Sequence, residues 1–280
     1  MRRLPAMALG FAVVASAGAP LAQQASPTQA GPVDVALVLA VDVSLSMDYR
    51  EQRAQRDGYI EAMAHPAVID AIVRGPRGRI AVAYMEWGGP WTQRVVIPWR
   101  VVASTEDTAA LAADLAAAPI SSSRGTSITA AIDAAVALLA QSPPADRMVI
   151  DISGDGPNNM GGPVLAARDR AAAAGVEING LPIMLGEDDL TFSIRDLDLY
   201  YEQCVISGPT AFVIPVLDLS GFATAIRQKL VLEIAGLDPI RRALTVPPAD
   251  DGLVVPAQSA IDCEIGERLY ERWRRGGDFN

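Results

Sequence analysis

Hydrophobic residues form short, nearly continuous runs that alternate with segments of helical spacing. The first run, VDVALVLAVDVS from Val33, is rich in β-branched residues and ends in an Asp and a serine. This pattern favours a strand buried on both faces of a parallel sheet over a short helix. Pro98 cannot donate a ladder hydrogen bond, so the strand containing it is expected at a sheet edge. The later strands are predicted at 79–87, 92–98, 147–153, 176–183 and 211–216.

Helical segments lie between these strands, several of them introduced by Ser or by acidic residues. The order of elements predicts a doubly wound α/β fold, with a mainly parallel sheet, helices on both faces and one antiparallel edge strand. Ligands of such folds bind beyond the carboxyl ends of the strands. The helices are predicted at 47–64, 67–73, 104–117, 127–140, 163–174 and 221–234.

The two ends of the chain differ from this pattern. Arg2 and Arg3, a short apolar stretch and small residues up to Ala22 are typical of a secretory signal peptide over 1–22, with a retained anchor as the alternative. Residues 23–32 are expected to form a linker, 33–235 the folded domain, and 236–280 a C-terminal extension without a clear core pattern. We therefore expect a periplasmic or secreted protein, with no membrane-spanning segment once the signal is removed.

The charge and the cysteines narrow the expected partners and compartment. The net charge is -10 and Lys229 is the only lysine, so no basic patch is available for nucleic acid. Cys204 and Cys263 are the only cysteines. In an oxidising compartment they could form a disulfide that ties the C-terminal extension to the domain, and two separate buried thiols are the alternative.

Three polar segments follow strands or precede a helix on what should be one edge of the sheet. They are Asp42-Val43-Ser44-Leu45-Ser46, Gly125-Thr126-Ser127 and Ser153-Gly154-Asp155-Gly156. Hydroxyl and carboxylate oxygens suit hard divalent cations such as Mg²⁺. A cation held by few carboxylates would still attract a carboxylate from another protein. Helix capping by Ser46 or Asp48 is the structural alternative for the first segment alone.

The three segments in this order resemble the metal-ion-dependent adhesion site of von Willebrand factor A domains, and the resemblance covers about residues 33–235. The segments YMEW, GTSI, CVISGP and KLVLEIA further resemble a bacterial family of exported proteins, DUF1194. The resemblance implies that Ser44, Ser46 and Thr126 bind a divalent cation directly, while Asp42 and Asp155 act mostly through water. Mg²⁺ is the expected ion, with Mn²⁺ and Ca²⁺ as alternatives. The family often has Thr before the last Asp, where this chain has Gly154.

Other residues have a structural interpretation beside the functional one. Glu187, Asp188 and Asp189 could bind Ca²⁺, but a solvated loop is favoured. The only histidine, His65, is not expected near the serines, which argues against Ser-His-Asp chemistry. Further candidates for the site or its surroundings are Glu86, Trp87, Trp91, Trp99, Asp151, Asn158 and Asn159.

Three functions remain open at this stage. The leading hypothesis is a non-enzymatic binding module that captures an Asp or Glu carboxylate of a partner protein. The second is a Mg²⁺-dependent phosphohydrolase with Asp42 as nucleophile, although Ser44 stands where such enzymes usually have a second Asp. The third is a structural domain with an incidental or degenerate metal site.

Overall fold

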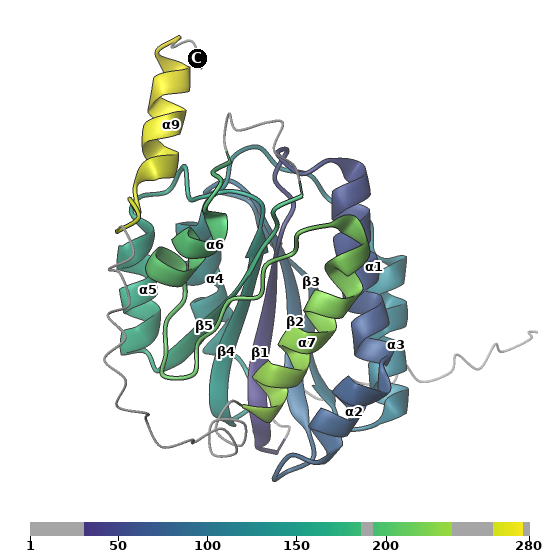
Figure 1. Ribbon diagram of the computed structural model, residues 1–280. Coiled ribbons are helices and arrows are strands. Elements are labelled where there is room, and N and C mark those ends of the chain that lie inside the picture. Colours follow the sequence, from purple (N-terminus) through teal and green to yellow (C-terminus); the bar gives the residue numbers. More distant parts are fainter. Residues whose placement is uncertain (1–30, 186–192, 237–259, 277–280) are drawn as a thin grey trace, which may run out of the picture.

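The computed structural model describes residues 31–185, 193–236 and 260–276, which form a five-stranded sheet with helices on both faces (Figure 1). The strand order is β3-β2-β1-β4-β5, in which only the pairing of β2 with β3 is antiparallel. This confirms the predicted fold class and the edge position of the Pro98 strand. The strands are β1 (Val33–Asp42), β2 (Ile80–Trp87), β3 (Gln93–Val102), β4 (Ala145–Gly154) and β5 (Val176–Pro182).

The central strand β1 is buried along its whole length because helices cover both faces of the sheet. Its successive side chains point to opposite faces. Val35, Leu37, Leu39 and Val41 belong to one hydrophobic core, and the alanines and valine between them belong to the other. The strongly apolar run in the sequence follows from this double burial.

Two groups of helices supply the other halves of these cores (Figure 1). One face is covered by α1 (Tyr49–Ala64), α2 (Pro66–Val73), α3 (Thr105–Ala117) and α7 (Phe222–Ala235), the last following a 3₁₀ turn (Leu219–Gly221). The opposite face is covered by α4 (Ile128–Leu139), α5 (Val164–Ala173), α6 (Leu197–Tyr200) and a π-helical turn (Tyr201–Val205).

The strand predicted at 211–216 is wrong as a regular element. This segment makes isolated parallel bridges to β5 and its end, between Val213 and Gly180 and between Val216 and Ile183. Pro182 interrupts the ladder, because proline has no N–H to donate to this segment. The segment therefore follows the edge of the sheet without becoming a sixth strand.

The C-terminal extension contains an element that the sequence pattern did not predict. Helix α9 (Ile265–Arg274) stands beyond the end of the sheet, apart from the other helices (Figure 1). A disulfide between Cys204 and Cys263 joins the residues before α9 to the π-helical turn. The structure thus contains the expected disulfide rather than two separate thiols. Among the described residues, no helix is both long and apolar enough to cross a membrane.

Candidate metal site

The chain reverses its direction of winding at β1. Strand β2 is added on one side of β1 and β4 on the other, which places a topological switch point between β1 and β4. Loops diverge at such a point and leave a crevice beyond the carboxyl ends of the strands. Asp42 ends β1, and Asp155 directly follows β4. The topology alone therefore brings these two carboxylates together.

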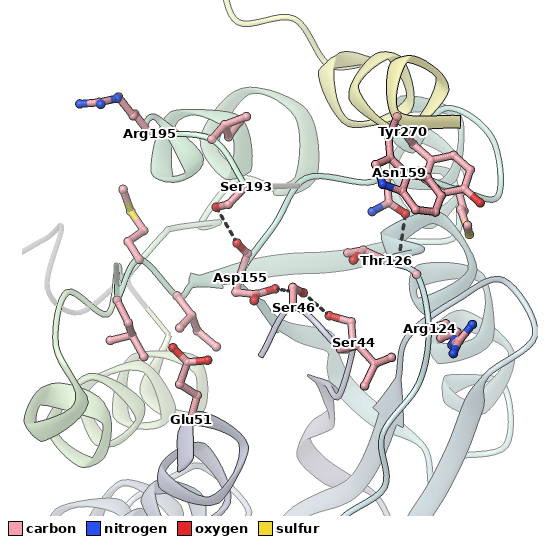
Figure 2. Close-up of a pocket in the computed structure, with 18 of the residues that line it drawn as sticks. Ser44, Ser46, Glu51, Arg124, Thr126, Asp155, Asn159, Ser193, Arg195 and Tyr270 are labelled. Atoms are coloured by element: carbon pink, nitrogen blue, oxygen red, sulfur yellow. Dashed lines mark hydrogen bonds between the residues drawn. The ribbon is translucent and has the colours of Figure 1, made fainter. Parts of the chain in front are cut away.

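A short hydrogen-bonded chain links the first and last segments of the predicted site. The Asp42 carboxylate accepts a hydrogen bond from the Ser44 backbone N–H at 2.7 Å, and the hydroxyl oxygens of Ser44 and Ser46 are 2.7 Å apart. The Ser46 hydroxyl donates to Asp155 Oδ1 at 2.8 Å (Figure 2). Ser46 is not the cap of α1, because Asp48 accepts from the Glu51 N–H and forms a capping box with it.

The middle segment is attached to the first by backbone pairing. Ser123 donates its N–H to the Val43 carbonyl at 2.8 Å, and Leu45 donates to the Ser123 carbonyl at 2.8 Å. Thr126 follows this bridge, and its N–H donates to the side chain of Asn159 at 3.0 Å (Figure 2). The loop between α3 and α4 therefore brings the Thr126 hydroxyl group to the crevice, although α1, α2 and α3 separate this loop from β1 in the chain.

A cavity of about 1020 Å³ opens at this end of the sheet. Four of the five predicted ligands line it, namely Ser44, Ser46, Thr126 and Asp155. Asp42 lies beneath them, completely buried. Across the described residues, no three His, Cys, Asp or Glu side chains cluster as a metal site, so any cation here would depend on hydroxyl oxygens.

The electrostatics of the two carboxylates fit a cation. Burial raises the pKa of Asp42 well above its usual range, and the nearby charge of Asp155 raises it further. Burial also raises the pKa of Asp155 to about 6, although the hydrogen bond from Ser46 opposes this rise. Asp42 Oδ2 is buried and has no hydrogen-bond partner. An orphaned carboxylate oxygen costs free energy unless a cation or a water bound to one compensates it.

Gly154 stands where the resemblance led us to expect Thr, and its surroundings leave no room for a larger side chain. A Cβ atom at this position would lie 2.8 Å from Asp42 Oδ2, 2.9 Å from the Tyr201 hydroxyl and 3.2 Å from the Trp87 ring. The Tyr201 hydroxyl is itself buried without a partner. Tyr201 and Trp87 therefore occupy the volume that a threonine side chain would need.

The far wall of the cavity contains residues that the sequence reasoning missed. Tyr270 of α9 lines it (Figure 2), and so does Trp273 of the same helix. The two aromatic rings stack with centroids 5.8 Å apart. The only sequence signal was the three-residue spacing of two aromatic side chains among charged ones, shortly after Cys263.

Several candidates prove to be structural. Glu86 is buried in ion pairs with Arg56 and Arg94, and Asp151 pairs with Lys229 at 2.8 Å. His65 caps α2 by accepting from the Ala67 N–H, away from the cavity. The acidic cluster Glu187, Asp188 and Asp189 lies outside the described residues.

Of the candidate tryptophans and asparagines, most are packed inside the protein and one lies on its surface. Trp87 is completely buried and Trp99 donates to the Leu138 carbonyl, whereas Trp91 is 95% exposed. Asn158 and Asn159 are both buried in the loop after Asp155. Only Asn159 of these five lines the cavity.

The position of Asp42 bears on the phosphohydrolase alternative. Its carboxylate is completely buried and does not line the cavity. A nucleophile must come within about 3–3.5 Å of the atom it attacks. This arrangement gives the phosphohydrolase hypothesis no support.

The strand order and the helices on both faces of the sheet give the chain a fold of the von Willebrand factor A type, as the resemblance implied. The chain belongs to the family described as protein of unknown function (DUF1194), whose profile matches residues 32–238. No curated protein matches the chain in sequence.

Solved structures are similar at low sequence identity. The pilus adhesin SpaC from Lactobacillus rhamnosus GG has 14% identity and a TM-score of 0.55, over 75% of this chain and 31% of SpaC. Proximal thread matrix protein 1 from the mussel byssus has 14% identity and a TM-score of 0.53, over 73% of this chain and 49% of that protein. A further structure of the mussel protein has a zinc-occupied MIDAS motif (13% identity, TM-score 0.52, over 73% of this chain and 49% of that one). The chain thus spans half or less of these proteins, and the likeness shows the fold alone.

Proposed function

We propose that this protein is an exported, non-enzymatic binding module that holds a divalent cation and captures an acidic group of a partner protein. Ser44, Ser46 and Thr126 would bind the cation directly, and Asp42 and Asp155 would act through bound water. The bound ion would supply an electrophilic site for an incoming carboxylate. Mg²⁺ is the expected ion because the donors are all hard oxygens, with Mn²⁺ and Ca²⁺ as alternatives.

The observation that carries the proposal is the chain of oxygens from Asp42 through Ser44 and Ser46 to Asp155. This chain joins the buried Asp42, whose Oδ2 has no hydrogen-bond partner, to the partly buried Asp155, which lines the open cavity. The zinc-occupied MIDAS motif of the mussel protein and the adhesin SpaC are consistent with it as relatives of the same fold. The Cys204–Cys263 disulfide supports a periplasmic or secreted location, since disulfides persist in oxidising compartments.

Isothermal titration calorimetry with Mg²⁺ and Mn²⁺ tests the cation site. We expect saturable binding to the unaltered chain and none that can be measured for the double variant Ser44→Ala/Ser46→Ala. Ser122→Ala is the matched control, because Ser122 is exposed in the loop before Thr126 and does not line the cavity. Equal heats for the double variant and the unaltered chain would show that the hydroxyls hold no cation.

A further inference from the structure

The cavity above the candidate cation site has a second wall that belongs to the C-terminal extension. We propose that α9 forms half of the partner-binding surface, so that an acidic peptide segment of the partner lies between the cation site and the Tyr270–Trp273 pair. The segment would present a carboxylate to the cation and a neighbouring apolar side chain to the two rings. This inference rests on the proposed function and adds the element that selects the ligand.

Several independent contacts hold α9 in this position. Cys263 is joined to the buried Cys204, and the Ile261 N–H donates to the Gln203 side chain at 2.9 Å. Within α9, Gly266 packs against the backbone of Asn158 so closely that an added Cβ would lie 2.1 Å from the Asn158 carbonyl oxygen. The helix is therefore fixed at its first turn, while its later turns carry the aromatic pair over the cavity.

Asn158 connects α9 to the candidate cation site. It lies three residues after Asp155, and its side chain donates to Glu267 of α9 at 2.6 Å. The same side chain accepts from the Thr129 N–H at 3.1 Å, at the start of the helix that follows Thr126. The amide thus joins α9 to both loops that carry predicted ligands, and the two walls keep a fixed spacing.

The size and lining of the cavity point to a peptide segment as its occupant. Its volume of about 1020 Å³ lies at the upper end of the range for pockets that enclose small molecules, roughly 300–1,000 Å³. A single carboxylate would leave most of it empty. The remaining lining is largely apolar, contributed by Met160, Met184, Leu185, Ile194 and Leu217. An apolar side chain next to the carboxylate would bury this surface.

The charges favour an acidic segment. Two arginines, Arg124 and Arg195, lie on opposite sides of the site, and two carboxylates, Glu51 and Asp155, lie between them (Figure 2). With the buried Asp42 counted as a third carboxylate, two arginines and a bound divalent cation still exceed the negative charges by one, so the occupied cavity would be positive on a chain whose net charge is -10. An acidic ligand would therefore be attracted to this cavity rather than to the rest of the surface.

A displayed library of heptapeptides with a fixed central Asp tests the proposal, with the same library carrying central Asn as its control. Two variants alter only the far wall. Gly266→Ala forces α9 away from Asn158 while favouring the helical state, and Tyr270→Ala/Trp273→Ala removes the rings. Arg274→Ala is the control on α9, because Arg274 is exposed and does not line the cavity.

On the unaltered chain with Mg²⁺, we expect enrichment of Asp peptides that carry apolar or aromatic neighbours, and loss of this enrichment with chelator. Both far-wall variants should bind the selected peptides at least about tenfold more weakly, as expected for central aromatic residues of an interface. Their Mg²⁺ binding in calorimetry should be unchanged, which also shows that the domain is folded. Arg274→Ala should bind them as the unaltered chain does.

Three results would overturn the inference or its basis. Equal peptide binding by both far-wall variants would show that α9 takes no part. Dimers that exclude every peptide, detected by analytical ultracentrifugation, would assign the cavity to a second copy of the chain. Mg²⁺ binding without any preference for Asp over Asn peptides would instead contradict the proposed function, since no carboxylate would then be captured.

Discussion

Gly154 shows how one position of the site motif is confined by residues far away in the sequence. The missing side chain leaves room that the Tyr201 hydroxyl and the Trp87 ring fill from the π-helical turn and from β2. Asp42 keeps its place below the hydroxyls because nothing wider than a glycine stands beside its Oδ2. A side chain at position 154 would therefore disturb the packing of Asp42, Tyr201 and Trp87.

Gly154→Ala should lower the free energy of unfolding by about 1–3 kcal/mol, because the added methyl group overpacks a filled site. In a Tyr201→Phe background the loss should be smaller, since the hydroxyl 2.9 Å from the added Cβ is removed. Urea denaturation measures both effects. Gly221→Ala is the control, because its Cβ would have ordinary contacts of 3.6 Å. A loss at Gly154 no larger than at Gly221 would contradict this account.

The sequence predicted that Asp42 and Asp155 lie close together but did not predict what surrounds them, for a physical reason. Asp42 and Asp155 could be placed because parallel strands end at one edge of a sheet, so a residue at a strand end has a known location. Tyr201 and Trp273 could not be placed in this way. They reach the site from a π-helical turn and from an appended helix, whose positions depend on packing and on a disulfide rather than on local periodicity.

At the level of elements, the predicted helices and strands agree with the structure where hydrophobic periodicity was strong. The predictions were wrong or missing for segments whose conformation depends on tertiary contacts, such as 211–216 and α9. Because β1 is buried on both faces, its sequence is a continuous apolar run that predicts a strand. The helices after Ser104 and Ser127 begin there because each serine side chain caps the helix with a hydrogen bond. Helix α9 has only Gly266 buried. A helix of that length gains little from propensity alone, so its presence depends on anchors that local sequence does not reveal.

Cys263→Ser should release α9 without disturbing the sheet. We expect faster amide hydrogen exchange over residues 265–274, and a free energy of unfolding lower by about 2–4 kcal/mol from the loss of a disulfide that closes a loop of 59 residues. Mg²⁺ binding should persist, because none of the proposed ligands is on α9. The unaltered chain after reduction is the matched comparison. Unchanged exchange in α9 would mean that the other contacts suffice to hold it.

Across the whole molecule, a group of buried charges ties α7 to the sheet. Lys229 pairs with Asp151 of β4 and with Glu233, which also accepts from Asn179. One cation thus faces two carboxylates. Burial and the charge of Asp151 raise the pKa of Glu233 and Lys229 opposes the rise, so that the pKa is about 8. Glu233 therefore retains a proton to a higher pH in the folded protein than in the unfolded chain.

This arrangement predicts a pH dependence of stability. The folded state binds a proton at Glu233 that the unfolded state releases above its ordinary pKa of 4.5, so the stability from this group falls as pH rises from about 4.5 to 8. Glu233→Gln should flatten this slope while keeping an acceptor for Lys229 and Asn179. Urea midpoints measured across this range test it. An equally steep slope in Glu233→Gln would assign the pH dependence to other groups.

The burial of Lys229 has a practical consequence for chemical modification. It is the only lysine of the chain, and it is completely enclosed. In the folded protein, amine-directed reagents such as succinimidyl esters will therefore find no accessible ε-ammonium group and will react only at the α-amino end. Acylation of Lys229 then becomes a reporter of global opening, and attachment of the protein to beads or dyes for binding work has to use other chemistry.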